Sequence, residues 1–459
     1  MTLSARIGAF TSALDMSSLA PDVEELARLC LLNAYGMALC GLDTPYAPVA
    51  RAAALAMEGE QTGGASLLGD GRRTGIAGAT LANAALFHGR AQEDTCGAGH
   101  FGTVLIPLLT AIIEARRMDT THFLPALVAG YEAGGLVEQA FARQTTPAGF
   151  RSTTLYGTIA AAAATARLMR LDARQTAGAL ENAVSFTGGV LQSFADGTDE
   201  WRYQPGIVAR NGWAAAELAR AGSVSAPHAF EGKSGLGRAF ARADTDVAAL
   251  AAKLGRDWAI RRVTFKPHPV CAFNQTPVTA ALALREQVGV DAIAAVRVRM
   301  NPFETGYAGM DATGPFRSIS GTLMSIPFCI ATTLVHGAPS MRQMTTYDDT
   351  AVNALEGAIT LVTDDAVPTL SAVIEADLVS GATITHRQTM VETDYQFARG
   401  DLLAMLKRIG AQQGLDGSLI DRVDGFTRHL PHADIRDIPA IFADAPTTSG
   451  NAGRGGPGT

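Results

Sequence analysis

The sequence predicts a mainly α-helical protein, with one large all-helical domain and a smaller α+β domain. The composition is the first reason: hydrophobic residues make up 47% of the 459 residues, charged residues only 18%, and 48 residues are glycine. Small and apolar residues in these amounts are typical of a large, ordered protein whose helices pack closely. The second reason is periodicity. Apolar residues recur at helical spacing as far as about Asp257, and patterns typical of strands begin only after it.

Helices are expected along most of the N-terminal half of the chain. The first, at 22–42, follows a Pro-Asp start signal and repeats apolar residues such as Leu26 and Leu29 at helical spacing. The others are expected at 46–58, 80–87, 104–117, 121–142, 155–169, 173–194, 207–221 and 245–254. The Gly-rich segment 67–76 is expected to form a loop or a brief hairpin.

The C-terminal half of the chain mixes strands with helices. Alternating residues predict strands at 260–266 and 294–300, and a hairpin of 372–378 with 382–388 around Ser380-Gly381. Helices are expected at 276–288, 318–336, 350–361, 400–410 and 418–423. We therefore divide the chain into a helical region of residues 1–258, an α+β domain 259–396, C-terminal helices 397–445 and a tail 446–459. The tail is rich in Gly, Ser, Thr and Pro and is expected to be disordered.

Charge and hydropathy exclude several classes of function. A formal net charge of −7 without a long basic run gives no electrostatic footprint for nucleic acid. The apolar runs are shorter than the ~20 residues of a membrane span, and the N-terminus lacks the apolar stretch of a signal peptide. The five cysteines show no Cys-x-x-Cys spacing, so we expect neither a disulfide framework nor a zinc site. A reduced, cytoplasmic protein is the simplest interpretation.

A polar loop between two helical segments is the main candidate site. Residues 88–107 contain two histidines, the pair Glu93-Asp94, Thr95, Cys96 and several glycines. Acid and imidazole groups packed between apolar helices shift each other's pKa values, which is typical of a functional site. A helix–loop–helix connection with Asp and Thr as helix caps would explain the same residues, and the loop alone does not decide between the two.

Four later segments also interrupt apolar helices with glycine and polar groups. They are 149–157, 196–212, 230–240 and 265–277. With the first loop, and in this order, they resemble the MmgE/PrpD family over residues 26–406. The resemblance rests on His88-Gly-Arg-Ala-Gln-Glu-Asp94, Gly149-Phe-Arg151 and Lys266-Pro-His268-Pro.

The resemblance implies a fold and a chemistry. The helical domain would be built from both chain ends, the α+β domain would lie between them, and the active site would lie where the two domains meet. Family members are typically homodimers that need no metal or organic cofactor. Their shared chemistry is removal of a proton next to a carboxylate, followed by loss of water or CO₂ or by reprotonation. Such chemistry needs a base, an acid, and cationic or N–H donors for the carboxylates.

The family pattern is only partly kept. The retained residues are Glu93, Asp94, Thr95, His100 and Lys266. The changed positions are Ala91 for the first acid, Arg151 and Gln204 for histidines, and Trp201 for a lysine. These changes argue against cis-aconitate or 2-methylcitrate itself as the substrate.

Roles follow from this comparison as hypotheses. His100 is the principal acid/base group, Lys266 holds a carboxylate or stabilises the enolate, and Asp94 and Thr95 orient His100 or the substrate. Arginine at position 151 would replace a proton shuttle by a fixed carboxylate clamp. The remaining candidates for substrate binding are His88, Glu93, Arg202, Tyr203 and His268. Helix capping by Asp94, Thr95 or His100, and an exposed Lys266, are the plain structural alternatives.

The sequence thus predicts a cofactor-independent lyase, a dehydratase or decarboxylase, that acts on a small carboxylate-bearing metabolite. An epimerase or isomerase would use the same proton abstraction, and a non-catalytic binding protein with a decayed site is the third alternative. A redox or phosphoryl-transfer enzyme is disfavoured, because no Gly-rich nucleotide motif follows a strand.

Overall fold

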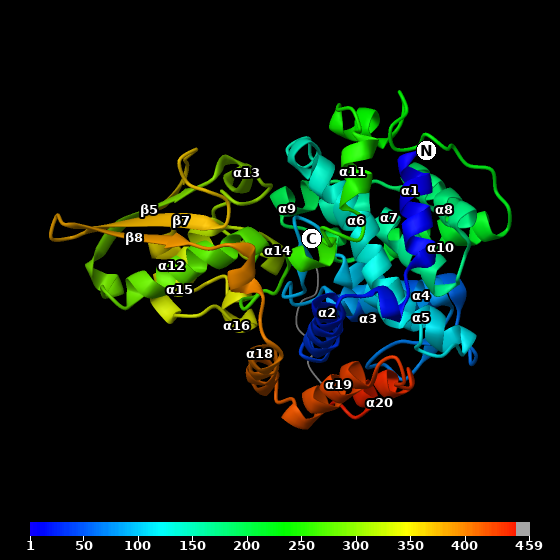
Figure 1. The fold of residues 1–459 in the computed structure, drawn as a ribbon. Coiled ribbons are helices and arrows are strands. Elements are labelled where there is room, and N and C mark those ends of the chain that lie inside the picture. Colours follow the sequence, from blue (N-terminus) through cyan, green and yellow to red (C-terminus); the bar gives the residue numbers. More distant parts are fainter. Residues whose placement is uncertain (447–459) are drawn as a thin grey trace.

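The computed structural model describes residues 1–446, which form two lobes (Figure 1). The larger lobe is helical, and the smaller one contains a mixed sheet. The predicted fold class, a large helical domain with a smaller α+β domain, is confirmed. The domain boundaries after residues 258 and 396 stay predictions, and apart from Pro446 the predicted disordered tail lies outside the described residues.

Helices from both chain ends build the large domain. They are α1 (Leu3–Ala13), α2 (Pro21–Leu39), α3 (Tyr46–Glu58), α4 (Ile76–Phe87), α5 (Gly102–Arg116), α6 (Phe123–Thr145), α7 (Ser152–Leu168), α8 (Ala173–Phe186), α9 (Gln192–Asp196), α10 (Gln204–Arg220), α11 (Val247–Lys253), α18 (Arg399–Ala411), α19 (Gly417–His429) and α20 (Asp437–Ala443). The last three return to the large domain, where α18 and α19 pack on α2 (Figure 1). A short hairpin of β1 (Ala65–Ser66) and β2 (Arg73–Thr74) confirms the hairpin alternative for 67–76.

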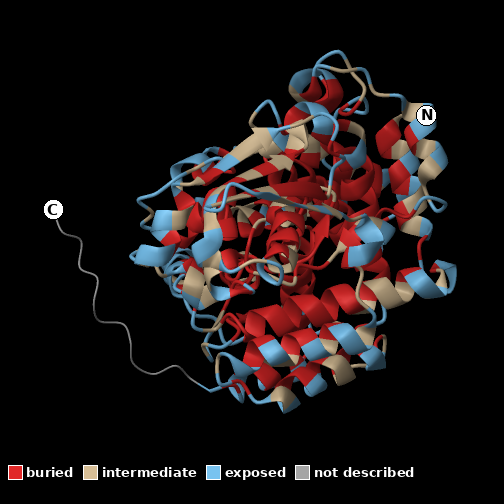
Figure 2. Ribbon diagram, turned by 90° about the vertical axis from the view of Figure 1, so that its left-hand side faces the viewer, coloured by how far each residue is buried: buried red, intermediate tan, exposed pale blue. Residues whose placement is uncertain are grey.

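Helix α7 is the centre of the large domain, because every one of its residues is buried. A helix that is buried on all sides has to be surrounded by others, and α7 packs against α5, α6, α8 and α10. Gly134 of α6 and Gly212 of α10 permit close approach, since Cβ atoms there would lie 2.7 Å from Cβ of Ala160 and 2.5 Å from Cβ of Ala161. Figure 2 shows the result: buried residues fill the middle of the molecule and exposed ones lie on its outer helices and loops.

The small domain is a four-stranded sheet covered by helices on one face. Its strands are β5 (Ile293–Met300), β6 (Ile359–Thr363), β7 (Ser371–Leu378) and β8 (Thr383–Thr389), in the order β6-β5-β7-β8. Only the β5–β6 pair is parallel. Its helices are α12 (Gln275–Arg285), α13 (Pro302–Thr305), α14 (Ile319–Thr322), α15 (Ile326–His336), α16 (Met341–Met344) and α17 (Thr350–Glu356).

The sheet has one apolar and one charged face. Val296, Val298 and Met300 of β5 are buried, as the alternation predicted. On the opposite face Arg297 pairs with Glu375 of β7 at 2.9 Å. Helices α12 and α15 pack against the sheet, so the apolar side chains join the core of the small domain.

Several predicted elements were wrong in extent or type. The helix predicted at 173–194 ends at Phe186, because Gly188 and Gly189 take positive φ angles of 158° and 133°. The helix predicted at 318–336 is interrupted before Ser325, whose hydroxyl accepts from the N–H of Phe328 and starts α15 afresh. Residues 359–361, predicted as helix, belong to strand β6.

Two further differences concern a predicted strand and a helix near the N-terminus. The strand predicted at 260–266 is reduced to β4 (Val263–Thr264) after a 3₁₀ turn, Ala259–Arg262. Helix α1 was not predicted. It packs on α8 so closely that a Cβ on Gly8 would lie 2.7 Å from the carbonyl oxygen of Ala173.

Candidate active site

A two-stranded bridge brings the polar loop to Lys266. The loop leaves α4 at His88 and enters α5 at Gly102, and within it β3 (Thr95–Cys96) pairs antiparallel with β4. Thr95 lies opposite Thr264, and their hydroxyl oxygens are 2.7 Å apart. Glu93 and Lys266 each lie two residues beyond this pair, so their side chains meet although 173 positions separate them in the chain.

Glu93 is the centre of a buried cluster of titratable groups. Its Oε1 accepts a hydrogen bond from Nζ of Lys266 and lies 3.1 Å from Nδ1 of His100, while its Oε2 lies 3.0 Å from Nδ1 of His88. Burial raises the pKa of Glu93, but the groups that face it outweigh burial and hold this pKa well below its usual range. The side chains of Glu93 and Lys266 are only 2% and 4% exposed, so this is a buried ion pair.

His100 is a neutral imidazole with one free nitrogen. Burial lowers its pKa well below 6.5, and the charge of Lys266 lowers it further. Its Nδ1 faces the backbone oxygen of Asp94 at 3.3 Å. A carbonyl oxygen only accepts, so Nδ1 carries the proton and Nε2 keeps a lone pair. The side chain is 15% exposed, which gives this base some access to a ligand.

The side chain of Asp94 points away from the cluster. Its Oδ2 accepts a 2.6 Å hydrogen bond from the hydroxyl of Tyr131, and burial raises its pKa to about 6. A Cβ at Gly102 would lie 2.0 Å from its Oδ1, so the start of α5 needs glycine there. Asp94 therefore acts on His100 through its backbone oxygen. Tyr131 is a partner that sequence reasoning missed, because nothing distinguishes it from other apolar positions of α6.

Arg151 lies in a second corner of the site, where protein groups surround its guanidinium. Its NH1 donates to the carbonyl oxygen of Trp201 at 2.5 Å and to Oε1 of Gln204 at 2.8 Å, and its NH2 lies 2.8 Å from Nε2 of His88. Arginine only donates, so His88 accepts at Nε2 and carries its proton on Nδ1. Burial lowers the pKa of His88 to about 4 and that of Arg151 to about 10.

The other predicted binding residues lie outside the Glu93 cluster. Arg202 is fully buried and stacked between the rings of Tyr46 and Trp201, 3.8 and 3.9 Å from their centroids. Burial lowers the pKa of His268 to about 4, and the nearest charge acting on it is Arg408 of α18. Tyr203 is half-buried at the start of α10. Within residues 1–446, no hydrogen bond or ion pair joins these three side chains to Glu93, His100 or Lys266.

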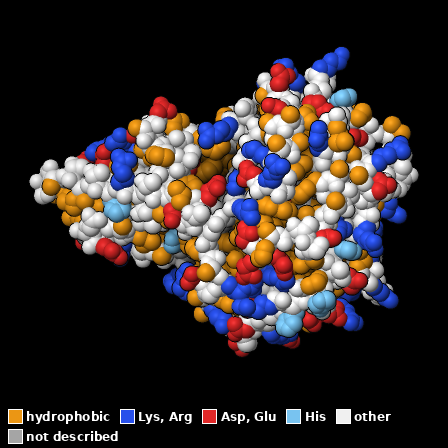
Figure 3. Space-filling view, in the orientation of Figure 1, with side chains coloured by type: hydrophobic (Ala, Val, Ile, Leu, Met, Phe, Trp, Pro, Cys, Tyr) orange, Lys and Arg blue, Asp and Glu red, His pale blue; other side chains and the backbone are white. Residues whose placement is uncertain are grey.

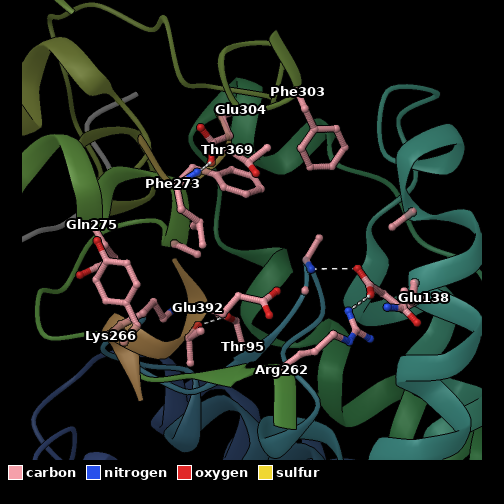
Figure 4. A pocket seen from close by; sticks show the side chains of 18 of the residues that line it. Thr95, Glu138, Arg262, Lys266, Phe273, Gln275, Phe303, Glu304, Thr369 and Glu392 are labelled. Carbon is pink, nitrogen blue, oxygen red and sulfur yellow. Dashed lines mark hydrogen bonds and ion pairs between the residues drawn. The ribbon is translucent and has the colours of Figure 1, made fainter. Parts of the chain in front are cut away.

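A cavity of about 230 Å³ opens beside the cluster, between the two domains (Figure 4). Of the predicted site residues, Thr95 and Lys266 line it. Arg262 and Glu138 lie on the large-domain side, where they pair at 3.3 Å, and Phe273, Phe303 and Glu304 line the small-domain side. These five residues were not predicted as site residues. Phe273 falls in the Gly- and Pro-containing segment 265–277, whereas the other four carry no signal in the sequence.

Comparisons with known proteins agree with this architecture. The model of the MmgE/PrpD N-terminal domain matches residues 5–247, and that of the MmgE/PrpD C-terminal domain matches residues 268–407. This chain belongs to the MmgE/PrpD family. A curated relative, the cis-aconitate decarboxylase-like protein oryM of Aspergillus oryzae, is 31% identical over 233 residues. That match covers 48% of this chain and 48% of the relative.

Membership in the MmgE/PrpD family confirms the resemblance seen in the sequence. In the described residues of this family member all five cysteines are free, and no group of three or more His, Cys, Asp or Glu side chains is placed to hold a metal ion. None of the described helices is both long and apolar enough to cross a membrane.

Proposed function

We propose that this MmgE/PrpD-family protein is a cofactor-independent lyase, a dehydratase or decarboxylase, that acts on a small carboxylate-bearing metabolite. The observation that supports this most is the group Lys266–Glu93–His100. It combines a buried cation and a neutral imidazole, each within hydrogen-bonding distance of the same carboxylate. A relative that matches this chain along about half of its own length is named a cis-aconitate decarboxylase-like protein. That name points to the same chemistry.

The reaction begins when a substrate carboxylate enters the cavity at Lys266 and Thr95. This carboxylate takes the place of Glu93 as the partner of the Lys266 ammonium, and the substrate extends past Lys266 toward His100. Nε2 of His100 removes the proton next to the carboxylate, while the Lys266 charge stabilises the enolate that forms. Glu93, now released from Lys266, balances the imidazolium of His100 from 3.1 Å. In a dehydratase the enolate expels the hydroxyl group of the neighbouring carbon, which leaves as water with the proton of the His100 imidazolium. In a decarboxylase the imidazolium instead returns this proton at the other end of a conjugated double bond, and a proton from solvent takes the place of the CO₂ that leaves.

Proton NMR in D₂O with a panel of carboxylic acids tests the proposal. The panel contains citrate, 2-methylcitrate, cis-aconitate, and hydroxy- and amino-succinates with their esters and amides. Loss of a C–H signal together with a new vinyl signal supports the lyase. Deuterium that enters a substrate without a new product indicates the epimerase instead. Binding without exchange or turnover indicates the non-catalytic alternative.

His100→Asn is the decisive variant, because it removes the base and keeps a polar side chain of similar size. We expect the rate of exchange or turnover to fall about 10²–10⁴-fold. The matched control is His228→Asn, at an exposed histidine that pairs with Glu231 at 3.1 Å, and it should keep the full rate. An equal rate in the two variants would contradict the assignment of His100 as the base.

The homodimer implied by the family resemblance and the cytoplasmic location inferred from the sequence remain predictions. Assembly as a homodimer is tested by gel filtration with light scattering, and the cytoplasmic location by fractionation of cells that express the full chain. Neither result bears on the assignment of the catalytic groups.

A further inference from the structure

The cavity beside Lys266 has two chemically different sides. Thr95, Arg262 and Lys266 lie on the side of the large-domain core, and Phe273 and Phe303 lie with Glu304 on the side of the small domain. Figure 4 shows the two phenylalanines on the opposite side of the space from Thr95 and Lys266. In the space-filling view the surface between the lobes is hollowed, with hydrophobic side chains at its floor (Figure 3). A ligand in this cavity therefore meets Thr95 and Lys266 at one end and the two aromatic rings, next to Glu304, at the other.

The aromatic side is a rigid wall. The rings of Phe273 and Phe303 meet edge to face with centroids 5.9 Å apart, and Phe273 packs in the same way on Tyr307 at 5.2 Å. Tyr307 in turn contacts Phe194, at 5.9 Å. Phe273 and Phe303 are both only half-buried, so part of each ring faces the cavity. Covering this apolar surface with a ligand is favourable, in proportion to the area removed from water.

Two of the three cations that line the cavity are already paired, and the third, Arg143, is exposed to solvent. Arg262 is bonded to Glu138 and to the carbonyl oxygen of Gly135, and Lys266 is bonded to Glu93. One substrate carboxylate can exchange with Glu93 at Lys266, but a second would find Arg262 already paired and would meet only the solvent-screened charge of Arg143. Two of the changed positions, one with a histidine and one with a lysine in the family pattern, hold Arg151, bound by protein groups, and the buried Trp201. The site is thus built for fewer carboxylates and more apolar surface than a tricarboxylic acid presents.

We propose that the substrate is an acid whose carboxylate lies at Lys266 and Thr95 and which carries an apolar substituent of several carbon atoms, bound against Phe273 and Phe303. This inference rests on the proposed function for the reaction, but it concerns only recognition. It assigns the phenylalanine pair as the specificity-determining residues of the cavity.

A series of unreactive ligands tests recognition without turnover. Dissociation constants of succinate and of 2-methyl-, 2-propyl- and 2-pentylsuccinate are measured by calorimetry with the full chain. Each added methylene should tighten binding about fourfold, which is the transfer free energy of a buried CH₂ group expressed as an affinity ratio. Propane-1,2,3-tricarboxylate should bind no more tightly than succinate.

Variants then show which residues cause the gain in affinity per methylene. Phe303→Ala and Phe303→Gln should each reduce the gain per methylene to less than about twofold, because the ring that covers the chain is lost. Phe273→Ala should do the same, and circular dichroism shows whether this more tightly packed variant is folded. Phe186→Ala, at a phenylalanine that is 38% exposed outside the cavity, is the matched control and should keep the wild-type gain. Lys266→Met should weaken every ligand by a similar factor and leave the gain per methylene unchanged.

The outcomes separate this inference from the proposed function. A dissociation constant that does not change with chain length, or a gain in Phe303→Ala equal to that in Phe186→Ala, overturns the apolar-substituent proposal even if the protein is a lyase. A fourfold gain in affinity per methylene that depends on Phe303, with no turnover of any panel compound, supports the recognition proposal and contradicts only the lyase proposal.

Discussion

The site has two corners that bury a cation in different ways. In the first, Lys266 meets the carboxylate of Glu93. In the second, the acceptors that Arg151 meets within residues 1–446 are uncharged: the Trp201 carbonyl, Gln204 and His88. A carboxylate partner is exchangeable for a substrate carboxylate, whereas backbone, amide and imidazole acceptors hold a guanidinium in place. The comparison thus separates a corner in which a substrate can bind the cation from a corner in which the cation holds protein groups in place.

His88 joins the two corners. Its Nε2 accepts from Arg151, which leaves the proton on Nδ1, and this nitrogen lies 3.0 Å from Oε2 of Glu93. At three of the four changed positions, Arg151 contacts both of the other residues, since it donates to the carbonyl oxygen of Trp201 and to Gln204. Arginine at 151 needs these acceptors, because an unpaired buried N–H is costly. The changes therefore form one packed unit that supports His88.

Glu93→Gln breaks the first corner and should have the largest effect on stability. The substitution leaves Lys266 charged, buried and without its carboxylate, and losing one member of a buried ion pair costs about 3–5 kcal/mol. We expect the free energy of unfolding from urea titration to fall by this amount. Glu392→Gln is the matched control, an exposed glutamate that lines the same cavity, and it should change the free energy by less than about 0.5 kcal/mol. A loss below about 1 kcal/mol for Glu93→Gln would contradict the buried pairing with Lys266.

His88 and Asp94 should make the free energy of unfolding depend on pH in opposite directions. The pKa of His88 is lowered to about 4 from 6.5, so between these values the unfolded chain binds more protons and acid costs stability, by up to about 3 kcal/mol. The pKa of Asp94 is raised from 3.8 to about 6, so in that window the folded chain binds more protons and acid adds stability. Because of His88, the free energy of unfolding falls as the pH drops below 6.5, and Asp94 partly offsets this fall.

Urea titrations at several pH values between about 4 and 6.5 measure both contributions. His88→Gln, whose amide oxygen still accepts from Arg151, should reduce the loss of stability on acidification relative to wild type. Asp94→Asn, which still accepts from Tyr131, should increase it. Parallel pH profiles for the two variants would show that neither group titrates in the folded state as its burial requires.

The sequence predicted the regions of the fold that depend on long apolar periodicity. The segments 104–117 and 155–169 became α5 and α7 because continuous apolar residues leave no other solution for a buried helix. The errors arose where a local feature overrode periodicity, as at Gly188-Gly189, or where tertiary pairing decided, as for 359–361, which β5 recruits as a strand.

The candidate site was predictable to a similar degree. The family pattern pointed to Glu93, His100 and Lys266, and the structure places these three side chains together. Their contact depends on a bridge of only two residue pairs, Thr95 with Thr264 and Cys96 with Val263, which is too short to leave a pattern in the sequence. The aromatic wall was beyond prediction, because half-buried rings such as Phe303 have the same local sequence signal as core residues.

Arg151→Lys tests the second corner and should have the smallest effect. A lysine ammonium is a point charge and cannot reproduce the planar fork that reaches Trp201, Gln204 and His88 at once, so at least one acceptor loses its donor. We expect a loss of about 1–3 kcal/mol in the free energy of unfolding. Turnover should fall less than tenfold, because His100, Glu93 and Lys266 keep their contacts. Arg210→Lys, at an exposed position of α10, is the control and should change neither quantity. If Arg151→Lys instead keeps wild-type stability and loses turnover a hundredfold or more, the guanidinium acts on the substrate, and the distinction between the two corners fails. A loss of stability with turnover largely retained means that Arg151 acts through the protein groups it binds, and that the exchangeable carboxylate partner belongs to Lys266 alone.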